Sequence, residues 1–258
     1  LAETGEADFP DKKAIDAINH WVRSKTKGKI KQLIGKIDPD TVLILVNTVY
    51  FKGNWESPFY KTDIFEDDFY LEGDEPIKQL FMSQTTNYPY FENDFVQAIE
   101  LPYQGRGLSM VVLLPKEGKT IDRIRAELSF EQWSSWMGQF QEKMVNIILP
   151  KFTLEYSSSL NDPLKAMGMP TAFSLDADFS KMVDGGGINI DEVIHKSFLD
   201  VSEEGTEAAA STSVIMREMK APLADYTMEV NRPFFLSIAD KETGMIIFLG
   251  EIQNPATD

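Results

Sequence analysis

The stretch after Gly205 has the composition of a loop but the side-chain alternation of a β-strand. Its sequence, GTEAAASTSVIM, contains few bulky side chains. Side chains alternate between two faces along a strand, and one face here is small or apolar throughout: Thr206, Ala208, Ala210, Thr212, Val214 and Met216. The other face carries the two charges, Glu207 and Arg217, and two of the four hydroxyls. The pattern predicts a segment able to lie in a sheet with one face buried, with Gly205 as a permissive pivot. An ordinary edge strand is the alternative.

Apolar, β-branched runs elsewhere predict a sheet that could receive such a segment. Residues 41–51 (TVLILVNTVYF) are apolar enough to predict a strand buried on both faces. Further strand-like runs are residues 107–115, 143–156, 192–202, 226–230, 234–240 and 244–252. The last two runs are joined at KETG, which is typical of a hairpin turn.

Helical periodicity marks three other segments. In residues 11–35 the apolar positions Ile15, Ile18, Trp21 and Val22 share one face. Residues 120–140 predict one amphipathic helix with Ile121, Ile124, Leu128 and Trp133 inward, and residues 159–168 predict a short helix. Strands gathered towards the end predict an α+β fold. We see no linker and expect one domain over residues 1–258.

Composition excludes several classes of function. The net charge of −16 argues against binding nucleic acid or an anionic membrane surface. There is no cysteine, there are two histidines, and no calcium-binding loop pattern occurs, so we expect neither a metal nor a cofactor. No apolar run is long enough to cross a bilayer. The glycines of residues 184–187 precede a strand-like run rather than a helix, which favours a turn over a phosphate site.

His195 is the one histidine that alternation places on an inward face. We expect a core histidine that has a hydrogen-bond partner. A catalytic role is the alternative, but no GxSxG nucleophile motif accompanies it.

Six motifs, in order along almost the whole chain, resemble the serpins, a family of serine protease inhibitors. They are LVNTVYFKGNWESPF, IILPKF, VIHKSFLDVSEEGTEAA with its hinge EEGTEAAASTS, NRPFFLSI and GMIIFLGEIQNP. The composition is more similar to that of prokaryotic members. The resemblance implies the serpin fold, a large mixed β-sheet A with sheets B and C and surrounding helices. It also implies that the chain is a C-terminal portion that starts just before the helix lying across the main sheet, with the earlier helices absent.

The resemblance implies an inhibitor that acts as a suicide substrate, not an enzyme. Residues 203–230 would be its reactive-centre loop, exposed in a metastable native state. A protease would cleave the loop between Met219 and Lys220, and the loop would then insert into sheet A and trap the covalent acyl-enzyme. The family's hinge falls on Glu203, Glu204, Gly205, Thr206, Glu207, Ala208, Ala209 and Ala210.

Two further polar groups carry over from the family. Asn47 and His195 match the shutter, which holds the sheet closed beneath the point where it opens. Trp55, Lys151 and Glu203 match the breach, where the loop first enters, and the Lys151–Glu203 pair would act as a latch on insertion.

Partners and alternatives follow from the same resemblance. The Met219–Lys220 bond favours a chymotrypsin-, elastase- or subtilisin-like protease, although Arg217 and Lys220 leave a trypsin-like one open. We expect a monomer when the protein is complete. The sequence does not give the compartment, and a secreted or cell-surface protein is favoured. A non-inhibitory serpin with a carrier, storage or chaperone role is the alternative; a hydrolase is a third, but it lacks a visible nucleophile.

Overall fold

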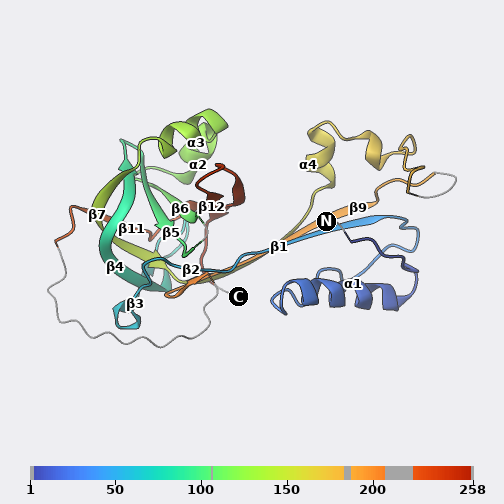
Figure 1. Cartoon of the computed structure of the whole chain (residues 1–258), viewed down its shortest axis with the longest axis horizontal. Helices are drawn as coiled ribbons and strands as arrows, with labels where there is room; N and C mark the ends of the chain where they lie inside the picture. Colours follow the sequence, from blue (N-terminus) through green and yellow to red (C-terminus); the bar gives the residue numbers. More distant parts are fainter. Residues whose placement is uncertain (1–2, 106, 183–186, 207–222, 257–258) are drawn as a thin grey trace. The chain divides into compact units, whose positions relative to one another are not determined.

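The computed structural model describes residues 3–105, 107–182, 187–206 and 223–256. By their contacts, the residues form two compact units, one from Leu1–Phe51 with Leu154–Leu199 and one from Lys52–Thr153 with Asp200–Asp258 (Figure 1). Each unit is described separately below. The single domain over residues 1–258 stays a prediction.

The first unit contains the helix predicted near the start of the chain, but this helix is shorter than its apolar pattern. Helix α1 spans Lys12–Lys25, and the Asp11 side chain caps it by accepting from the Lys13 amide. The helix ends at Thr26 because Lys27 and Gly28 take positive φ angles of 52° and 84°. The prediction that the helical segment runs to residue 35 is therefore wrong.

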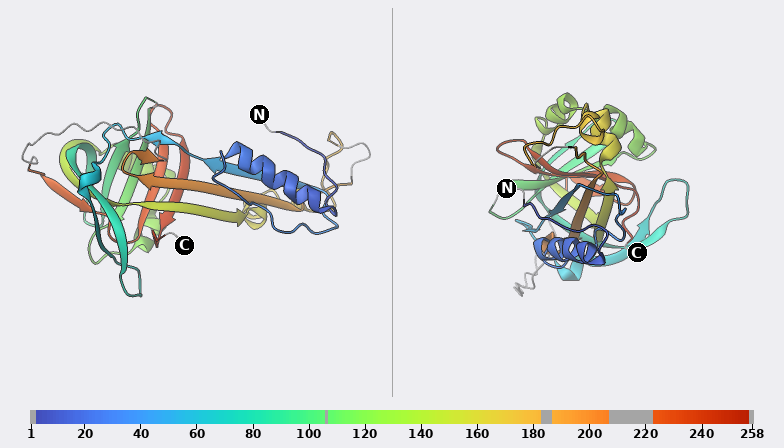
Figure 2. Two further views of the ribbon diagram at one scale, coloured as in Figure 1. Left: turned by 90° about the horizontal axis from the view of Figure 1, so that it is seen from below. Right: turned by 90° about the vertical axis from the view of Figure 1, so that its right-hand side faces the viewer.

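The strands of the first unit pack one face on α1. Strand β1 (Ile44–Tyr50) runs parallel to β9 (Glu192–Ser202), and β8 (Phe152–Ser159) pairs with the other edge of β9. Figure 2 shows α1 alongside β1 and β9, and their shared cluster consists of Val22, Ile30 and Phe198, with Trp21, Leu33, Val46 and Tyr50 packed against it.

The exposure of β1 contradicts the prediction that residues 41–51 are buried on both faces. Leu45, on the opposite face of β1 from Val46, is 40% exposed. Burial of both faces of this strand is therefore not observed, because α1 covers only the face that bears Val46 and Tyr50. The short helix predicted near residue 160 is confirmed as α4 (Asn161–Ala166), and a 3₁₀ turn, η2, follows at Thr171–Phe173.

The second unit is built on an eight-stranded sheet with the order β11-β7-β4-β5-β6-β12-β13, and β3 pairs with β4. The strands are β3 (Ile64–Phe69), β4 (Ile77–Glu92), β5 (Val96–Pro102), β6 (Leu108–Pro115), β7 (Gln141–Pro150), β11 (Tyr226–Glu229), β12 (Phe234–Asp240) and β13 (Ile246–Ile252). The strands predicted in residues 107–115 and after residue 225 are confirmed. The run 143–156 is interrupted at Lys151, between β7 and β8. No strand was predicted for β3, β4 or β5, and a one-turn 3₁₀ helix, η1 (Lys61–Asp63), precedes β3.

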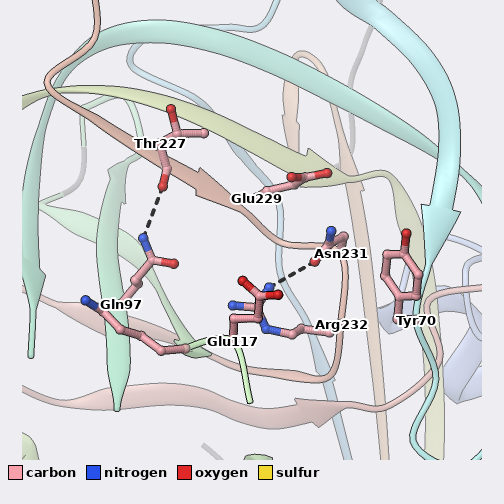
Figure 3. Close-up of a pocket in the computed structure, with 8 residues that line it drawn as sticks. Tyr70, Gln97, Glu117, Thr227, Glu229, Asn231 and Arg232 are labelled. Carbon is pink, nitrogen blue, oxygen red and sulfur yellow. Dashed lines mark hydrogen bonds between the residues drawn. The ribbon is translucent and has the colours of Figure 1, made fainter. Parts of the chain in front are cut away.

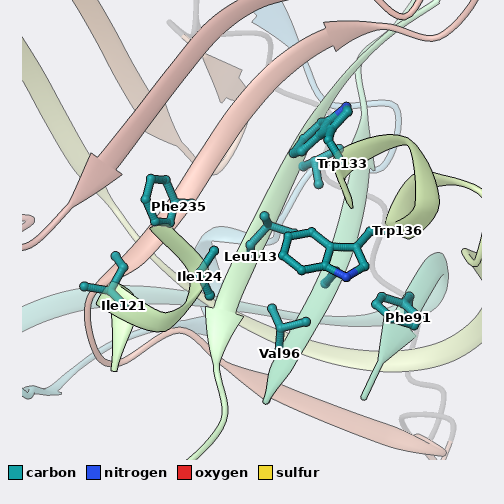
Figure 4. Close-up of a cluster of buried hydrophobic side chains, with 10 residues drawn as sticks. Phe91, Val96, Leu113, Ile121, Ile124, Trp133, Trp136 and Phe235 are labelled. Carbon is teal, nitrogen blue, oxygen red and sulfur yellow. The ribbon is translucent and has the colours of Figure 1, made fainter. Parts of the chain in front are cut away.

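Two helices cover one face of this sheet. Helices α2 (Ile121–Glu127) and α3 (Phe130–Met137) replace the single helix predicted over residues 120–140, because Leu128 is extended and Ser129 caps a new helix through the Gln132 amide. The cluster beneath them is drawn in Figure 4 and contains Phe91, Val96, Ala98, Val111, Leu113, Ile121, Ile124, Trp133, Trp136 and Phe235. The predicted inward positions Ile121, Ile124 and Trp133 are buried, and Leu128 is half-buried.

Candidate functional site

The first residues of the hinge are already paired as a strand in the second unit. The chain turns back at Glu203 and Glu204, so that β10 (Gly205–Thr206) pairs antiparallel with the end of β9. The other edge of β10 pairs antiparallel with β2 (Gly53–Asn54). Strand β10 therefore lies between two strands, with a neighbour on each side, rather than at a free edge.

Backbone contacts fix the turn itself. The Trp55 amide donates to the Glu204 carbonyl at 3.0 Å, and the Phe59 amide donates to the Glu203 carbonyl at 2.9 Å. The Ser202 hydroxyl donates to the Gly205 carbonyl at 3.0 Å. These bonds hold the hinge backbone against the segment that contains β2.

Gly205 occupies a position that has no room for a side chain. A Cβ atom there would lie 2.2 Å from the Gly53 carbonyl oxygen and 2.5 Å from the Asn54 Cα. Its φ of 141° also lies in a region that residues other than glycine rarely adopt. The glycine is therefore required for the close approach of β10 to β2.

Thr206 is fully buried and hydrogen-bonded. Its side chain has 0% exposure, and its Oγ1 lies 2.8 Å from the Tyr103 hydroxyl oxygen. Tyr103 stacks on Trp55 at 4.6 Å between ring centroids, and the Trp55 indole donates to the Ser202 carbonyl at 2.9 Å. Burial raises the pKa of Tyr103, so the phenol stays neutral and available for the hydrogen bond at physiological pH.

An ion pair joins the turn to the start of β8. Lys151 Nζ lies 2.6 Å from Glu203 Oε2, and the two side chains are 26% and 14% exposed. Burial raises the pKa of Glu203, but the hydrogen bond and charge of Lys151 outweigh that effect and hold the pKa below its ordinary value. Lys61 Nζ lies 3.3 Å from Glu204 Oε1, so a lysine contacts each acid of the turn.

The predicted shutter pair lies in the first unit. Asn47 on β1 and His195 on β9 are directly paired in register, and His195 Nδ1 lies 2.9 Å from Asn47 Oδ1. His195 thus has its expected partner. His195 is only half-buried and Asn47 is exposed, so the prediction of a core histidine is wrong.

The structure brings most of the described site residues together. Trp55, Lys151 and Glu203–Thr206 meet around β10, while Glu207, Ala208, Ala209, Ala210, Met219 and Lys220 lie outside the described residues. The same is true of residues 184–186 in the predicted glycine turn. Sequence reasoning missed Tyr103, Gly53 and Lys61. Tyr103 follows the end of β5, and no periodic pattern distinguishes it there.

A separate hollow in the second unit has a structural explanation. The pocket in Figure 3 has a volume of about 700 Å³ and carries both acidic and basic side chains, among them Glu117, Glu229 and Arg232. The Arg232 guanidinium donates from Nε and Nη2 to the Pro115 carbonyl, at 2.9 and 2.6 Å. The contacts of Arg232 therefore join the segment before β12 to the end of β6.

Two kinds of feature are absent from the described residues. Among the described residues, no group of three or more acidic or histidine side chains is arranged to hold a metal ion. In the same part of the chain, no helix is long and apolar enough to cross a membrane.

Comparisons with known proteins agree on one family. The family model for serpin (serine protease inhibitor) matches residues 1–255. A serpin-like protein of Thermococcus kodakarensis is 42% identical over 99% of this chain and 60% of its own length. The solved native structure of the thermophilic serpin tengpin is 35% identical, with a TM-score of 0.86 over 96% of this chain and 64% of that chain. The structure of thyroxine-binding globulin with thyroxine is 28% identical, with a TM-score of 0.87 over 97% of this chain and 67% of that one. The chain thus spans 60% of the length of the first relative.

Proposed function

Since the chain belongs to the serpin family, we propose that it inhibits a serine protease and does so as a suicide substrate. The fold is the serpin fold, and the family consists mostly of protease inhibitors rather than enzymes. The reactive-centre loop predicted over residues 203–230 serves as bait in the part before β11, because Tyr226–Glu229 pair with β7, and Met219 enters the primary specificity pocket of the protease.

The catalytic groups of the protease carry out the cleavage step, which precedes any movement of the loop. The protease serine attacks the carbonyl carbon of Met219, the amide bond to Lys220 breaks, and the amine of Lys220 leaves with a proton from the protease histidine. An ester between Met219 and the protease serine remains. Water would hydrolyse this ester, so inhibition requires that the cut loop insert into the sheet first and distort the protease active site.

The observation that carries this proposal is the pairing of β10. Gly205 and Thr206 already have a hydrogen-bonded strand on each side, so the start of an insertion track exists at the base of the loop. Thr206 is buried, as predicted for the small face of the alternating segment. The same alternation continues through Ala208, Ala210 and Thr212, whose small side chains would enter a sheet at low steric cost.

Hydrogen bonds alone would not drive insertion. Each new backbone bond contributes about 0.5–1.5 kcal/mol net, whereas ordering a residue costs about 1–2 kcal/mol. Side-chain burial and release of strain in the uninserted sheet must therefore supply the remainder. For this reason a bulky or charged residue on the inward face of the hinge is expected to prevent trapping.

A non-inhibitory role is the second candidate, and one comparison favours it. Thyroxine-binding globulin is a structural neighbour that binds a small molecule. Against this candidate, residues 205–212 contain no proline and one charged side chain, Glu207, which falls on the outward face. The hinge sequence therefore favours inhibition over a carrier, storage or chaperone role.

A protease panel tests the proposal. The full chain is incubated with chymotrypsin-, elastase-, subtilisin- and trypsin-like enzymes, and a denaturing gel is examined for an SDS-resistant adduct. The apolar side chain of Met219 favours the first three classes, and a secreted or cell-surface protein is expected to meet such enzymes. Absence of an adduct with every class would refute the inhibitory proposal.

Two variants separate trapping from simple cleavage. Thr206→Arg places an unpaired cation where Thr206 is fully buried, at a cost of several kcal/mol. We expect this variant to be cut without forming an adduct, whereas Thr206→Ser keeps the hydroxyl and traps normally. A stoichiometric adduct with Thr206→Arg would contradict insertion.

A further inference from the structure

We propose that Tyr103 is a positioning residue for loop insertion, because its hydroxyl holds Thr206 in the sheet as the seed of the inserted strand. This inference rests on the proposed inhibitory function and adds a residue and a role to it. Tyr103 would act through Thr206 and need not touch the protease.

Geometry places Tyr103 at the base of the seed. Tyr103 is 3% exposed, its ring stacks on the Trp55 ring at an interplanar angle of 13°, and an isolated antiparallel β-bridge joins the backbones of the two residues. The Trp55 indole in turn bonds to Ser202, the residue that pairs with Gly205. The Tyr103 hydroxyl is therefore fixed by the same two strand ends that flank β10, and its partner is the side chain of Thr206.

This arrangement defines the register of the hinge. A shift of β10 by one residue would turn the Thr206 side chain to the opposite face of the sheet and break its bond to Tyr103. The hydroxyl pair thus favours the register in which Thr206 points inward, and Ala208 and Ala210 follow with the same parity. A strand that starts in this register grows from an existing pair, so the entropic cost of bringing the first residues together is already met.

A docked hinge could have the opposite effect and restrain the loop. A restraint would lower the rate of association with a protease and would leave the stoichiometry of inhibition, which is set after cleavage, unchanged. A seed acts after cleavage, when insertion competes with hydrolysis of the acyl-enzyme. We infer a seed because the docked residues are the first two of the small-residue segment and are paired on both sides. The two roles predict different kinetic changes.

The test combines hydrogen exchange with inhibition kinetics on the full chain. Exchange of residues 201–206 in the uncut protein measures how often the hinge is docked. The stoichiometry of inhibition measures how many molecules are consumed for each protease trapped, and the association rate measures the encounter. The variants are Tyr103→Phe, Thr206→Val, their double variant and the conservative Thr206→Ser.

The matched control is Tyr90→Phe. Tyr90 is 2% exposed, and its hydroxyl donates to Glu92 and accepts from Gln97, each at 2.8 Å, so this change removes a phenol hydroxyl and its hydrogen bonds from the second unit. It does so away from β10. Effects that Tyr103→Phe shares with the control report on general stability and not on the hinge.

We expect Tyr103→Phe to speed exchange at residues 201–206 about two- to twelvefold, which corresponds to the loss of one net hydrogen bond. The stoichiometry of inhibition should rise while the association rate is unchanged. Thr206→Val should match Tyr103→Phe, and the double variant should be no worse than either single one, since both remove the same bond. Thr206→Ser should keep wild-type behaviour.

Three results would overturn the inference. They are unchanged exchange in Tyr103→Phe, the same changes in Tyr90→Phe, or faster association with unchanged stoichiometry. If Tyr103→Phe fails to fold, Thr206→Val decides. If the wild-type protein forms no adduct with any protease, the proposed function fails on its own, and exchange still decides whether Tyr103 holds the hinge.

Discussion

Replacing Gly205 by alanine should expel the hinge from the sheet. The new Cβ would meet three backbone atoms, the nearest at 2.2, 2.5 and 2.9 Å, and none belongs to a flexible side chain. Crowding of this kind costs about 1–3 kcal/mol, and an alanine at φ 141° adds about 1–3 kcal/mol of backbone strain. The minimum of about 2 kcal/mol lowers the docked population roughly 30-fold.

The protein can avoid this cost by releasing β10, so the loss of global stability is limited to the docking free energy of the hinge. Hydrogen exchange is the suitable assay: residues 201–206 should exchange at least about 30-fold faster in Gly205→Ala, while the strands of the second unit keep their protection. Trapping of protease should weaken in parallel.

Gly250→Ala is the matched control. Gly250 lies in β13, has no positive φ, and a Cβ added there would meet nothing within 4 Å. We expect this variant to behave as wild type. Unchanged hinge exchange in Gly205→Ala, or equal effects of the two substitutions, would refute the argument from close approach.

Three further outcomes are expected. Because the pKa of Glu203 is lowered, its pairing with Lys151 stabilises the protein above the ordinary glutamate range, and this stability is lost as the pH falls through the lowered pKa. The thermal midpoint should therefore fall between pH 7 and pH 3, and it should fall less in Lys151→Met. An equal fall in both proteins would contradict the pairing. Nicking the loop should raise the thermal midpoint, because the cut segment can enter the sheet; an unchanged or lower midpoint counts against metastability. Mass spectrometry of the peptide released from a trapped complex should find Lys220 at its start, whereas a start at Glu218 or Ala221 would move the cleavage site and favour a trypsin-like target.

The alternation and apolar runs of the sequence predicted strands correctly where one continuous segment forms the strand. The alternation in residues 192–202 and the buried run in 107–115 correspond to β9 and β6. Pattern failed where backbone geometry ends an element: Lys27 and Gly28 stop α1, and Ser129 starts α3 within what looked like one helix. Two-sided burial of β1 was also wrong, because an apolar composition does not say which faces a neighbouring element covers.

The sequence by itself determined the family, the alternation of small side chains in the hinge and the acidic and basic residues at its base, because these are properties of residue order. The tertiary structure alone decided that Gly205 and Thr206 pair with both β9 and β2, and that Tyr103 is the partner of the Thr206 hydroxyl. Tyr103 and Thr206 lie 103 positions apart in the chain. The hydrogen bond between them depends on tertiary pairing, because the Trp55–Tyr103 bridge brings the end of β5 beside β2, and β2 pairs with β10; no local pattern sets this.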